Sequence, residues 1–413
     1  MLSIMVARSD VSFLPHTIPH LIRMCRYPFA KKVLVRDTAP LADAFAQRQN
    51  IGTLSQLSAC CDHLQSSGLV DEIIDIDYSE ERRIQIYRRH FGSDVKDTHG
   101  WVGTSIFGYI YSVETADADY LVHFDSDMLL HQKKDRCWIE QGIDVLRRNP
   151  DVLVVNPLPG PPEKDGVLYQ MEPYDRDSAG FYRFKGFSSR VFLIDVGRFN
   201  RFLPLHPKSM PGGRLALWEQ MVSDRMIETS SSRADLDSHA AWVLHPNDHR
   251  SDFIAALPQI IERVEAGWYP PEQAGYYDLK LGAWMRHLGV YQTYASVRNV
   301  KQILEQWERR ILGVMRNRRL PRPLQKARLK LLITGERRWT WIVDLSDLEN
   351  PISTIDGPAD CTITVSGNDL IDLVNGELRP DVAMKHRWLR VDGDPKLFEY
   401  FSALLSTRAD EEG

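Results

Sequence analysis

Short apolar runs alternate with stretches of helical periodicity over the first 160 or so residues of the chain. The runs are rich in β-branched residues and are bounded by turn residues, which is typical of buried strands. Between them, apolar residues recur three or four positions apart, which predicts helices. This alternation predicts an α/β fold with a mostly parallel sheet and helices on both faces. The expected strands are 2–7, 31–37, 70–78, 120–124 and 151–157.

The pattern changes after this region. Residues 158–185 are rich in proline, glycine and tyrosine, and so long an irregular segment predicts a lid or binding loop. A strand over 189–196, a helix over 215–228 and a strand over 240–248 follow. We therefore expect a first domain at 1–265.

The remainder of the chain divides by composition. Residues 266–335 read as a helical, basic linker, and their charge indicates a solvated face or a surface for an anionic acceptor or membrane. Residues 336–413 hold alternating strands, a helix, a further strand and a closing amphipathic helix. This order predicts a small α+β C-terminal domain.

Composition narrows the class of protein. A chain of 413 residues can bury two or three sizeable cores, and its net charge of -5 argues against a protein that coats nucleic acid. Five scattered cysteines without a C-x-x-C pair fit a reducing compartment and neither a disulfide framework nor a zinc site. No run approaches the roughly 20 apolar residues that span a bilayer, and the N-terminal apolar stretch is too short for a signal peptide. We expect a cytoplasmic protein without a transmembrane segment.

Two carboxylates one residue apart, Asp125 and Asp127, end the strand at 120–124. Like charges this close repel each other unless a cation lies between them. Magnesium and manganese typically bind one or two carboxylates together with substrate phosphates. Ligands also bind at the carboxyl ends of strands in open sheets. The pair therefore predicts a metal–diphosphate site, with a solvated strand end as the alternative.

Three further side chains carry candidate chemistry. Asp37 ends the second strand and could hydrogen-bond a nucleotide base or ribose, or simply end the strand. Glu219, beside Trp218, could have a raised pKa suited to a general base, or could only complement the helix dipole. His245 could complete a carboxylate metal shell or be structural, and His249 competes with it.

These motifs, in this order, resemble those of the GT-A fold glycosyltransferases over residues 1 to about 260. The resemblance implies a Rossmann-like sheet that binds a nucleotide sugar and manganese or magnesium. It assigns the metal to Asp125, Asp127 and His245. It assigns the nucleotide sugar, for which uridine is the family's commonest nucleoside, to Ala7, Arg8, Ser9, Asp37, Asp125 and Ser126.

The W-E-Q sequence carries the catalytic part of the same resemblance. In inverting members of that family, a carboxylate at this place deprotonates the acceptor hydroxyl, which implies that Glu219 is the general base. Gln220 stands where a second acidic residue is usual, so the sequence leaves inversion and retention open.

The last 80 or so residues resemble the sterol carrier protein domain. The motifs that carry this resemblance are "DCTITVSGNDLIDLVNGELRPDVAM" and "WLRVDGDPKLFEYFSALL". The resemblance implies an apolar tunnel for a lipid. Appended domains of this kind also serve dimerisation or substrate cover, so a homodimer is a further expectation.

Together these patterns favour a metal-dependent glycosyltransferase that moves a sugar from a nucleotide-diphosphate sugar to a hydroxyl or similar acceptor. A hydrophobic natural product or lipid would suit the C-terminal domain, while a peptide or another sugar stays open. The alternative is a lipid-binding or transfer protein with a degenerate glycosyltransferase scaffold. A sugar-phosphate nucleotidylyltransferase is disfavoured because "VARSDVSFLP" lacks its glycine-rich loop, and a phosphatase because its D-x-D would lie near the start of the domain.

Overall fold

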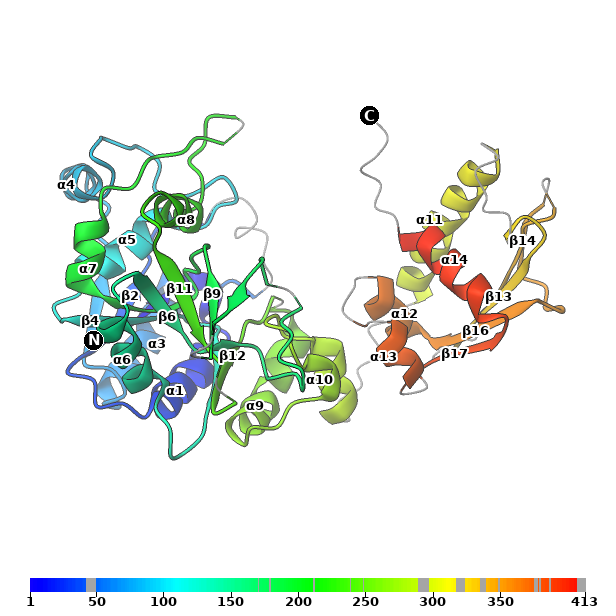
Figure 1. Cartoon of the computed structure of the whole chain (residues 1–413), viewed down its shortest axis with the longest axis horizontal. Helices are drawn as coiled ribbons and strands as arrows, with labels where there is room; N and C mark the ends of the chain where they lie inside the picture. Colours follow the sequence, from blue (N-terminus) through cyan, green and yellow to red (C-terminus); the bar gives the residue numbers. More distant parts are fainter. Residues whose placement is uncertain are drawn as a thin grey trace. The chain divides into compact units, whose positions relative to one another are not determined.

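The computed structural model divides into two compact units, Met1–Leu279 and Lys280–Gly413 (Figure 1). The sequence predicted boundaries after residues 265 and 335, whereas the structure divides the chain once, after Leu279. The second predicted boundary lies outside the described residues. The structure describes residues 1–41, 50–169, 171–177, 180–210, 212–237, 239–247, 249–288, 297–316, 324–334, 339–347, 350–374, 378, 380–385 and 388–406.

The first unit is built on a nine-stranded sheet in the order β3-β2-β1-β4-β10-β6-β11-β9-β8. Strands β9 and β10 run against the other seven, so the predicted α/β class holds with a mixed sheet. The strands are β1 Leu2–Val6, β2 Lys32–Arg36, β3 Glu72–Asp75, β4 Tyr120–Asp125, β6 Val152–Asn156, β8 Asp175–Arg176, β9 Phe181–Phe184, β10 Val191–Asp195 and β11 Ser232–Leu236.

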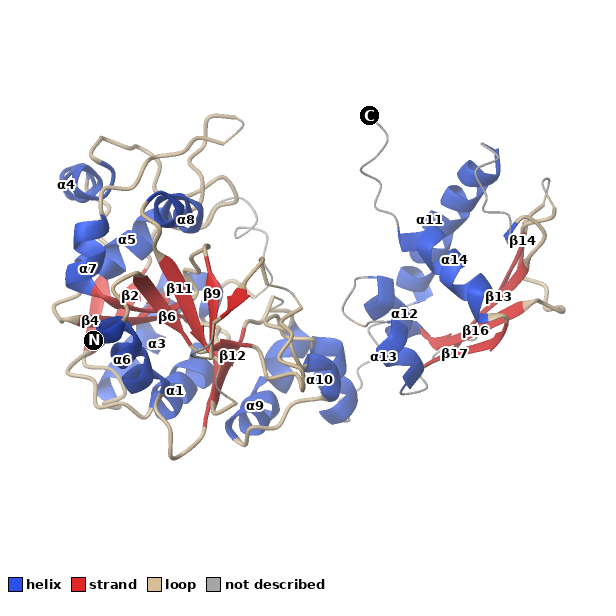
Figure 2. Ribbon diagram, in the orientation of Figure 1, coloured by secondary structure: helices blue, strands red, loops and turns tan. Residues whose placement is uncertain are grey.

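Helices cover both faces of this sheet, as the apolar strands predicted (Figure 2). On one face α4 Glu80–Phe91, α5 Ile106–Glu114, α7 Val196–Phe202 and α8 Trp218–Glu228 pack into a continuous apolar core. The other helices of the unit are α1 Leu14–Cys25, α3 Leu54–Ser66, α6 Trp138–Arg148 and α9 Ser251–Glu265, with short 3-10 turns at Arg8–Asp10 and Pro271–Gln273.

A second, three-stranded sheet lies beside the first, in the order β5-β12-β7. Its strands are β5 Leu129–Gln132, β7 Leu158–Pro159 and β12 Ala241–Leu244. Strand β5 follows the D-S-D sequence directly, and Leu129 pairs with Leu244 of the antiparallel β12. Because a fixed register fixes the residues beyond it, this pairing brings Asp127 and His245 to neighbouring positions.

The segment 158–185 is more regular than predicted. It contributes β7, β8 and β9, and β9 pairs with β11 in the main sheet. Tyr182 and Phe184 are buried, because alternate side chains of β9 face the interior. Residues 170, 178 and 179 lie outside the described residues, and the predicted lid role stays a prediction.

The second unit has a five-stranded sheet in the order β15-β14-β13-β16-β17. Its central strand, β13, comes from the stretch that the sequence predicted as linker. Leu329, Leu331 and Ile333 of β13 are buried and alternate with more exposed residues, so the basic residues of this strand form its outer face. The elements are α10 Leu281–Leu288, α11 Val297–Arg316, β13 Arg328–Thr334, β14 Trp339–Asp344, β15 Ile352–Ser353, β16 Cys361–Ser366, α12 Gly367–Val374, α13 Pro380–Lys385, β17 Leu389–Gly393 and α14 Pro395–Ser406.

The core of this unit joins α11, α12 and α14 to the sheet. Arg286 of α10 donates to Asp369 and Asp372 of α12, at 3.1 and 2.7 Å, so α10 is anchored to the same unit. Among the described residues, no helix combines the length and apolarity that crossing a membrane requires.

Candidate functional site

A cavity of about 350 Å³ lies where β1, β2 and β4 end. The carboxyl ends of parallel strands meet at one edge of a sheet, which explains why residues far apart in the sequence converge there. Eight residues that the sequence singled out line this cavity, and Arg8 does not. The eight are Ala7, Ser9, Asp37, Asp125, Ser126, Asp127, Glu219 and His245.

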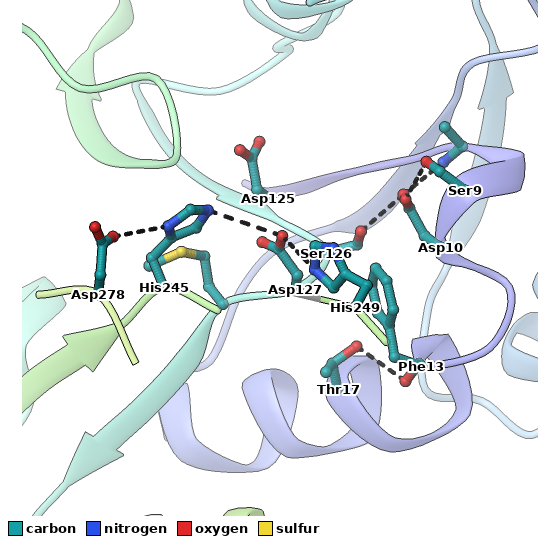
Figure 3. Close-up of polar contacts among 12 residues, drawn as sticks. Ser9, Asp10, Phe13, Thr17, Asp125, Ser126, Asp127, His245, His249 and Asp278 are labelled. Carbon is teal, nitrogen blue, oxygen red and sulfur yellow. Dashed lines mark hydrogen bonds and ion pairs between the residues drawn. The ribbon is translucent and has the colours of Figure 1, made fainter. Parts of the chain in front are cut away.

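Asp125 is the last residue of β4, and its side chain is turned away from Asp127 and His245 (Figure 3). The hydroxyl of Tyr109 donates to both carboxylate oxygens, at 3.1 and 3.0 Å. Burial raises the pKa of Asp125 well above its usual range, and the nearby Asp127 raises it further. Tyr109 of α5, which the sequence analysis did not single out, therefore sets the direction of this carboxylate.

Asp127 lies on the other side of the turn, among histidines. Its Oδ2 is 3.1 Å from Nε2 of His249 and 4.0 Å from Nε2 of His245. The other ring nitrogen of His245, Nδ1, is 3.0 Å from Oδ1 of Asp278 (Figure 3). A carboxylate bound to one imidazole nitrogen fixes the ring and leaves the other nitrogen for a ligand. Asp278 was not predicted, because it lies outside the recognised motifs.

The three predicted metal ligands do not converge. In the part of the chain that the structure describes, no group of three or more His, Cys, Asp or Glu side chains is arranged to hold a metal ion. Asp127 and His245 approach each other, while Asp125 turns to Tyr109 because β4 ends there and the chain curls. One carboxylate and one imidazole suit manganese or magnesium when diphosphate oxygens supply further ligands. The donor set thus fits two protein ligands rather than three.

Asp37 lies at the other end of the cavity. Its Oδ1 accepts hydrogen bonds from the Tyr78 hydroxyl and the Ala39 amide, both at 2.9 Å. The Tyr78 ring is nearly parallel to the ring of His99, which also lines the cavity. The second carboxylate oxygen of Asp37, Oδ2, accepts no hydrogen bond within the described part of the chain and can receive one from a ligand.

The sequence did not single out Asp10, which connects the first loop to the D-S-D turn. Its Oδ2 accepts from the Ala7 amide at 2.8 Å and from the Ser126 hydroxyl at 2.9 Å, while its Oδ1 accepts from Ser9 (Figure 3). Burial raises its pKa, although these hydrogen bonds oppose the rise. Asp10 thus holds in place three cavity residues that the sequence predicted.

Glu219 lies in the first turn of α8. Its Oε1 accepts hydrogen bonds from the amide and hydroxyl of Ser189, both at 2.8 Å. The neighbouring Trp218 is buried, with its ring stacked on Tyr109 at 5.8 Å between centroids. Oε2 of Glu219 accepts no hydrogen bond from the residues described, so one oxygen is anchored and the other can take a proton.

Comparison with known proteins identifies the C-terminal region. Residues 312–406 match the model of the SCP-2 sterol transfer family, which confirms the predicted sterol carrier protein-like domain and starts it earlier than residue 336. Sterol carrier protein 2 like 2 from Aedes aegypti is 22% identical and covers 25% of this chain and 97% of its own, with a TM-score of 0.21. Sterol carrier protein 2 from Yarrowia lipolytica, in its apo form, is 16% identical over 23% of this chain and 73% of its own, with a TM-score of 0.19.

The larger part of the chain has a more distant likeness. A crystal structure of GalNAc-T7 with UDP, GalNAc and Mn2+ is 14% identical and covers 71% of this chain and 48% of its own, with a TM-score of 0.39. No curated protein matches the chain.

Proposed function

We propose that the first unit is a metal-dependent glycosyltransferase that moves a sugar from a nucleotide-diphosphate sugar to an acceptor hydroxyl. One observation carries the proposal: the cavity brings together Asp37, the D-S-D turn, Glu219 and His245. A nucleoside contact, a diphosphate site and a base are the three parts such a reaction needs. The ends of β2, β4 and β12 and the first turn of α8 carry these residues to the cavity wall.

The nucleoside end of the cavity supports a uridine donor. Asp37 has one oxygen occupied by Tyr78 and Ala39, and its other oxygen can accept a hydrogen bond. The single ring N–H of uracil is a matching donor, whereas cytosine presents an acceptor at that position. Ala7 and Ser9, held by Asp10, line the adjacent wall.

The diphosphate end is formed by Ser126, Asp127 and His245. Manganese or magnesium, held by Asp127 and His245, would supply charge neutralisation for the diphosphate leaving group. Asp278 keeps Nε2 of His245 directed at Asp127. The Ser126 hydroxyl donates to Asp10, which fixes the turn between the two carboxylates of the motif.

Glu219 supplies the general base in this proposal. Ser189 anchors its Oε1, so Oε2 can accept the proton of the acceptor hydroxyl while that oxygen attacks the anomeric carbon. Attack from the face opposite the leaving group inverts the configuration.

The acceptor in this proposal is a hydrophobic natural product or a lipid, which the second unit holds or shields. The match to the SCP-2 sterol transfer family supports it. The same match favours a second candidate, a lipid-binding or transfer protein whose first unit is a degenerate scaffold. That candidate predicts retained lipid and no metal-dependent binding of nucleotide sugars.

A thermal-shift panel of nucleotide diphosphates and nucleotide sugars, with and without manganese, tests the proposal. We expect manganese-dependent stabilisation by UDP and by a UDP-sugar, because a ligand that binds only the folded state raises the melting temperature. Asp127→Ala should abolish this stabilisation, whereas Asp151→Ala, an exposed carboxylate at the amino end of β6, should leave it unchanged. If no donor stabilises the protein with manganese, the transferase function is wrong.

A further inference from the structure

Arg190, the residue before β10, has a guanidinium group that no side chain of the described residues engages. It lines the cavity, and its backbone carbonyl accepts a 2.7 Å hydrogen bond from the amide of Asp125. Neither hydrogen bonds nor ion pairs join its guanidinium to other described groups. A guanidinium carries five N–H donors, which in a protein interior are ordinarily paired. Donors that line a cavity and have no protein partner indicate a ligand with acceptor atoms.

The surroundings of Arg190 are acidic. Burial alone would lower its pKa, but Tyr277, Glu219 and Asp125 raise it on balance. The two carboxylates attract the guanidinium electrostatically without reaching ion-pair distance. Each is engaged elsewhere: Tyr109 donates to Asp125, and Ser189 donates to Glu219.

Hydrogen bonds connect the segment 189–190 to both carboxylate-bearing residues. Ser189 binds Glu219, and the next carbonyl, that of Arg190, binds the amide of Asp125. This part of the cavity wall therefore offers the N–H donors of Arg190 together with acceptor oxygens of Glu219 and Asp125. The guanidinium also lies within electrostatic range of Tyr277 and Asp278, both of which contact His245.

A neutral sugar matches this part of the cavity wall. One hydroxyl can donate to Asp125 and accept from the guanidinium at the same time, and a second can accept from the guanidinium. A uronic acid would place its own carboxylate beside Glu219, where like-charge repulsion opposes the gain from Arg190. In the proposed function the diphosphate is bound by Asp127 and His245, so UDP alone is the probe that separates phosphate contacts of Arg190 from its sugar contacts.

We infer that Arg190 determines donor specificity by binding two hydroxyls of a neutral hexose between Asp125 and Glu219. The inference rests on the proposed glycosyltransferase function and adds the chemical class of the transferred sugar. It assigns Arg190 to the sugar and not to the nucleotide.

Isothermal titration of the full chain with manganese separates these contacts. The probes are UDP, UDP-glucose, UDP-galactose, UDP-N-acetylglucosamine and UDP-glucuronate. We expect at least one neutral donor to bind about tenfold or more tightly than UDP-glucuronate. Arg190→Met should lower the affinity for that donor by about tenfold, because several charge-assisted hydrogen bonds are lost, and change the affinity for UDP less than about threefold.

Two further variants control for the fold and the charge. Arg148→Met, which removes an exposed arginine of α6, should leave every affinity unchanged. Arg190→Lys keeps the positive charge without the planar fork and should give an intermediate loss. An unchanged melting temperature shows that the variants fold.

Three results overturn the inference. An equal loss of affinity for UDP assigns Arg190 to the phosphates, and tight binding of UDP-glucuronate assigns it to a carboxylate. Unchanged affinity for every donor makes Arg190 structural. If UDP itself does not bind the wild-type protein with manganese, the proposed function is wrong. If UDP binds but the Arg190 variants give one of the three results above, only the inference about Arg190 is wrong.

Discussion

Single side chains around the cavity are positioned by hydrogen bonds from other elements. Tyr109 of α5 directs Asp125, Asp10 holds Ser126, and Ser189 anchors Glu219. Each of these contacts joins residues that are not neighbours in the same strand or helix. The chemistry of the site therefore depends on the packing of α5 and α8 against the sheet as much as on the motif residues.

Replacing Glu219 with glutamine tests the base at this scale. Glu219→Gln keeps an oxygen that can accept from Ser189 but cannot take a proton, so manganese-dependent release of UDP from the bound UDP-sugar should fall about 100-fold or more. Binding of the donor should stay within about threefold of wild type. Glu228→Gln, at the exposed end of the same helix, is the matched control. Unchanged release in Glu219→Gln would remove Glu219 as the base.

The sequence could predict residues at strand ends and could not predict their partners. Asp37, Asp125 and Asp127 follow apolar runs, and strands that end at one sheet edge bring such residues together. Tyr109 lies within an apolar helix whose pattern indicates only burial, and its contact with Asp125 depends on how α5 packs. Arg190 precedes a strand and carries no motif, so only the cavity distinguishes it from a surface arginine.

At the scale of elements, the pairing of β5 with β12 and the contact of α1 with α9 hold in position the strands beside Asp127 and His245, where we propose that the diphosphate binds. Helices α1 and α9 both pack against β5, and an ion pair between Arg23 and Glu265 joins them. Glu265 of α9 accepts from His20 of α1 at 2.8 Å and pairs with Arg23. Burial alone would raise the pKa of Glu265, but the hydrogen bonds from His20 and Arg23 lower it to about 2.

This contact predicts a pH dependence of stability. A carboxyl group whose pKa is lower in the folded state stabilises the fold fully above its usual pKa of 4.5, and this contribution is lost as pH falls from 4.5 toward 2. Glu265→Gln should therefore reduce the free energy of unfolding at pH 7 by about 1–2 kcal/mol, a value reduced for solvent screening.

Urea unfolding of the wild type and Glu265→Gln at several pH values between 7 and 3 measures this difference. The gap between the two proteins should narrow steadily below pH 4.5. Glu262→Gln, an exposed carboxyl one turn earlier in α9, should show no such gap. A gap that stays constant down to pH 3 would contradict the ionic origin of the stabilisation.

At the scale of the whole molecule, each of the two units has buried apolar residues and β-sheet structure of its own. The expectation of a helical linker was wrong for β13 because basic residues alternate there with buried leucines, a pattern that the charge count concealed. The small α+β domain was predicted because its strands and helices carry recognisable motifs. Its extension toward the N-terminus was missed because those motifs begin later in the chain.

Two compact units with separate buried interiors predict two thermal unfolding transitions. Calorimetry of the intact chain should resolve them, since each unit buries its own apolar surface. UDP with manganese should raise only one transition, and palmitate, a probe for lipid binding, should raise only the other. A single transition shifted equally by both ligands would show that the units unfold together. A shift by palmitate alone would favour the lipid-transfer candidate.

The register between β5 and β12 also has an evolutionary consequence. Leu129 opposite Leu244 sets Asp127 beside His245, whatever the length of chain between the two strands. The intervening chain includes the segment 158–185, which lies within the same unit but contributes none of the cavity-lining residues. Changes of length between β7 and β8 leave the register of β5 and β12 in place. Descendants of this protein can thus vary in the chain between β7 and β8 while the strands that set Asp127 beside His245 are inherited unchanged.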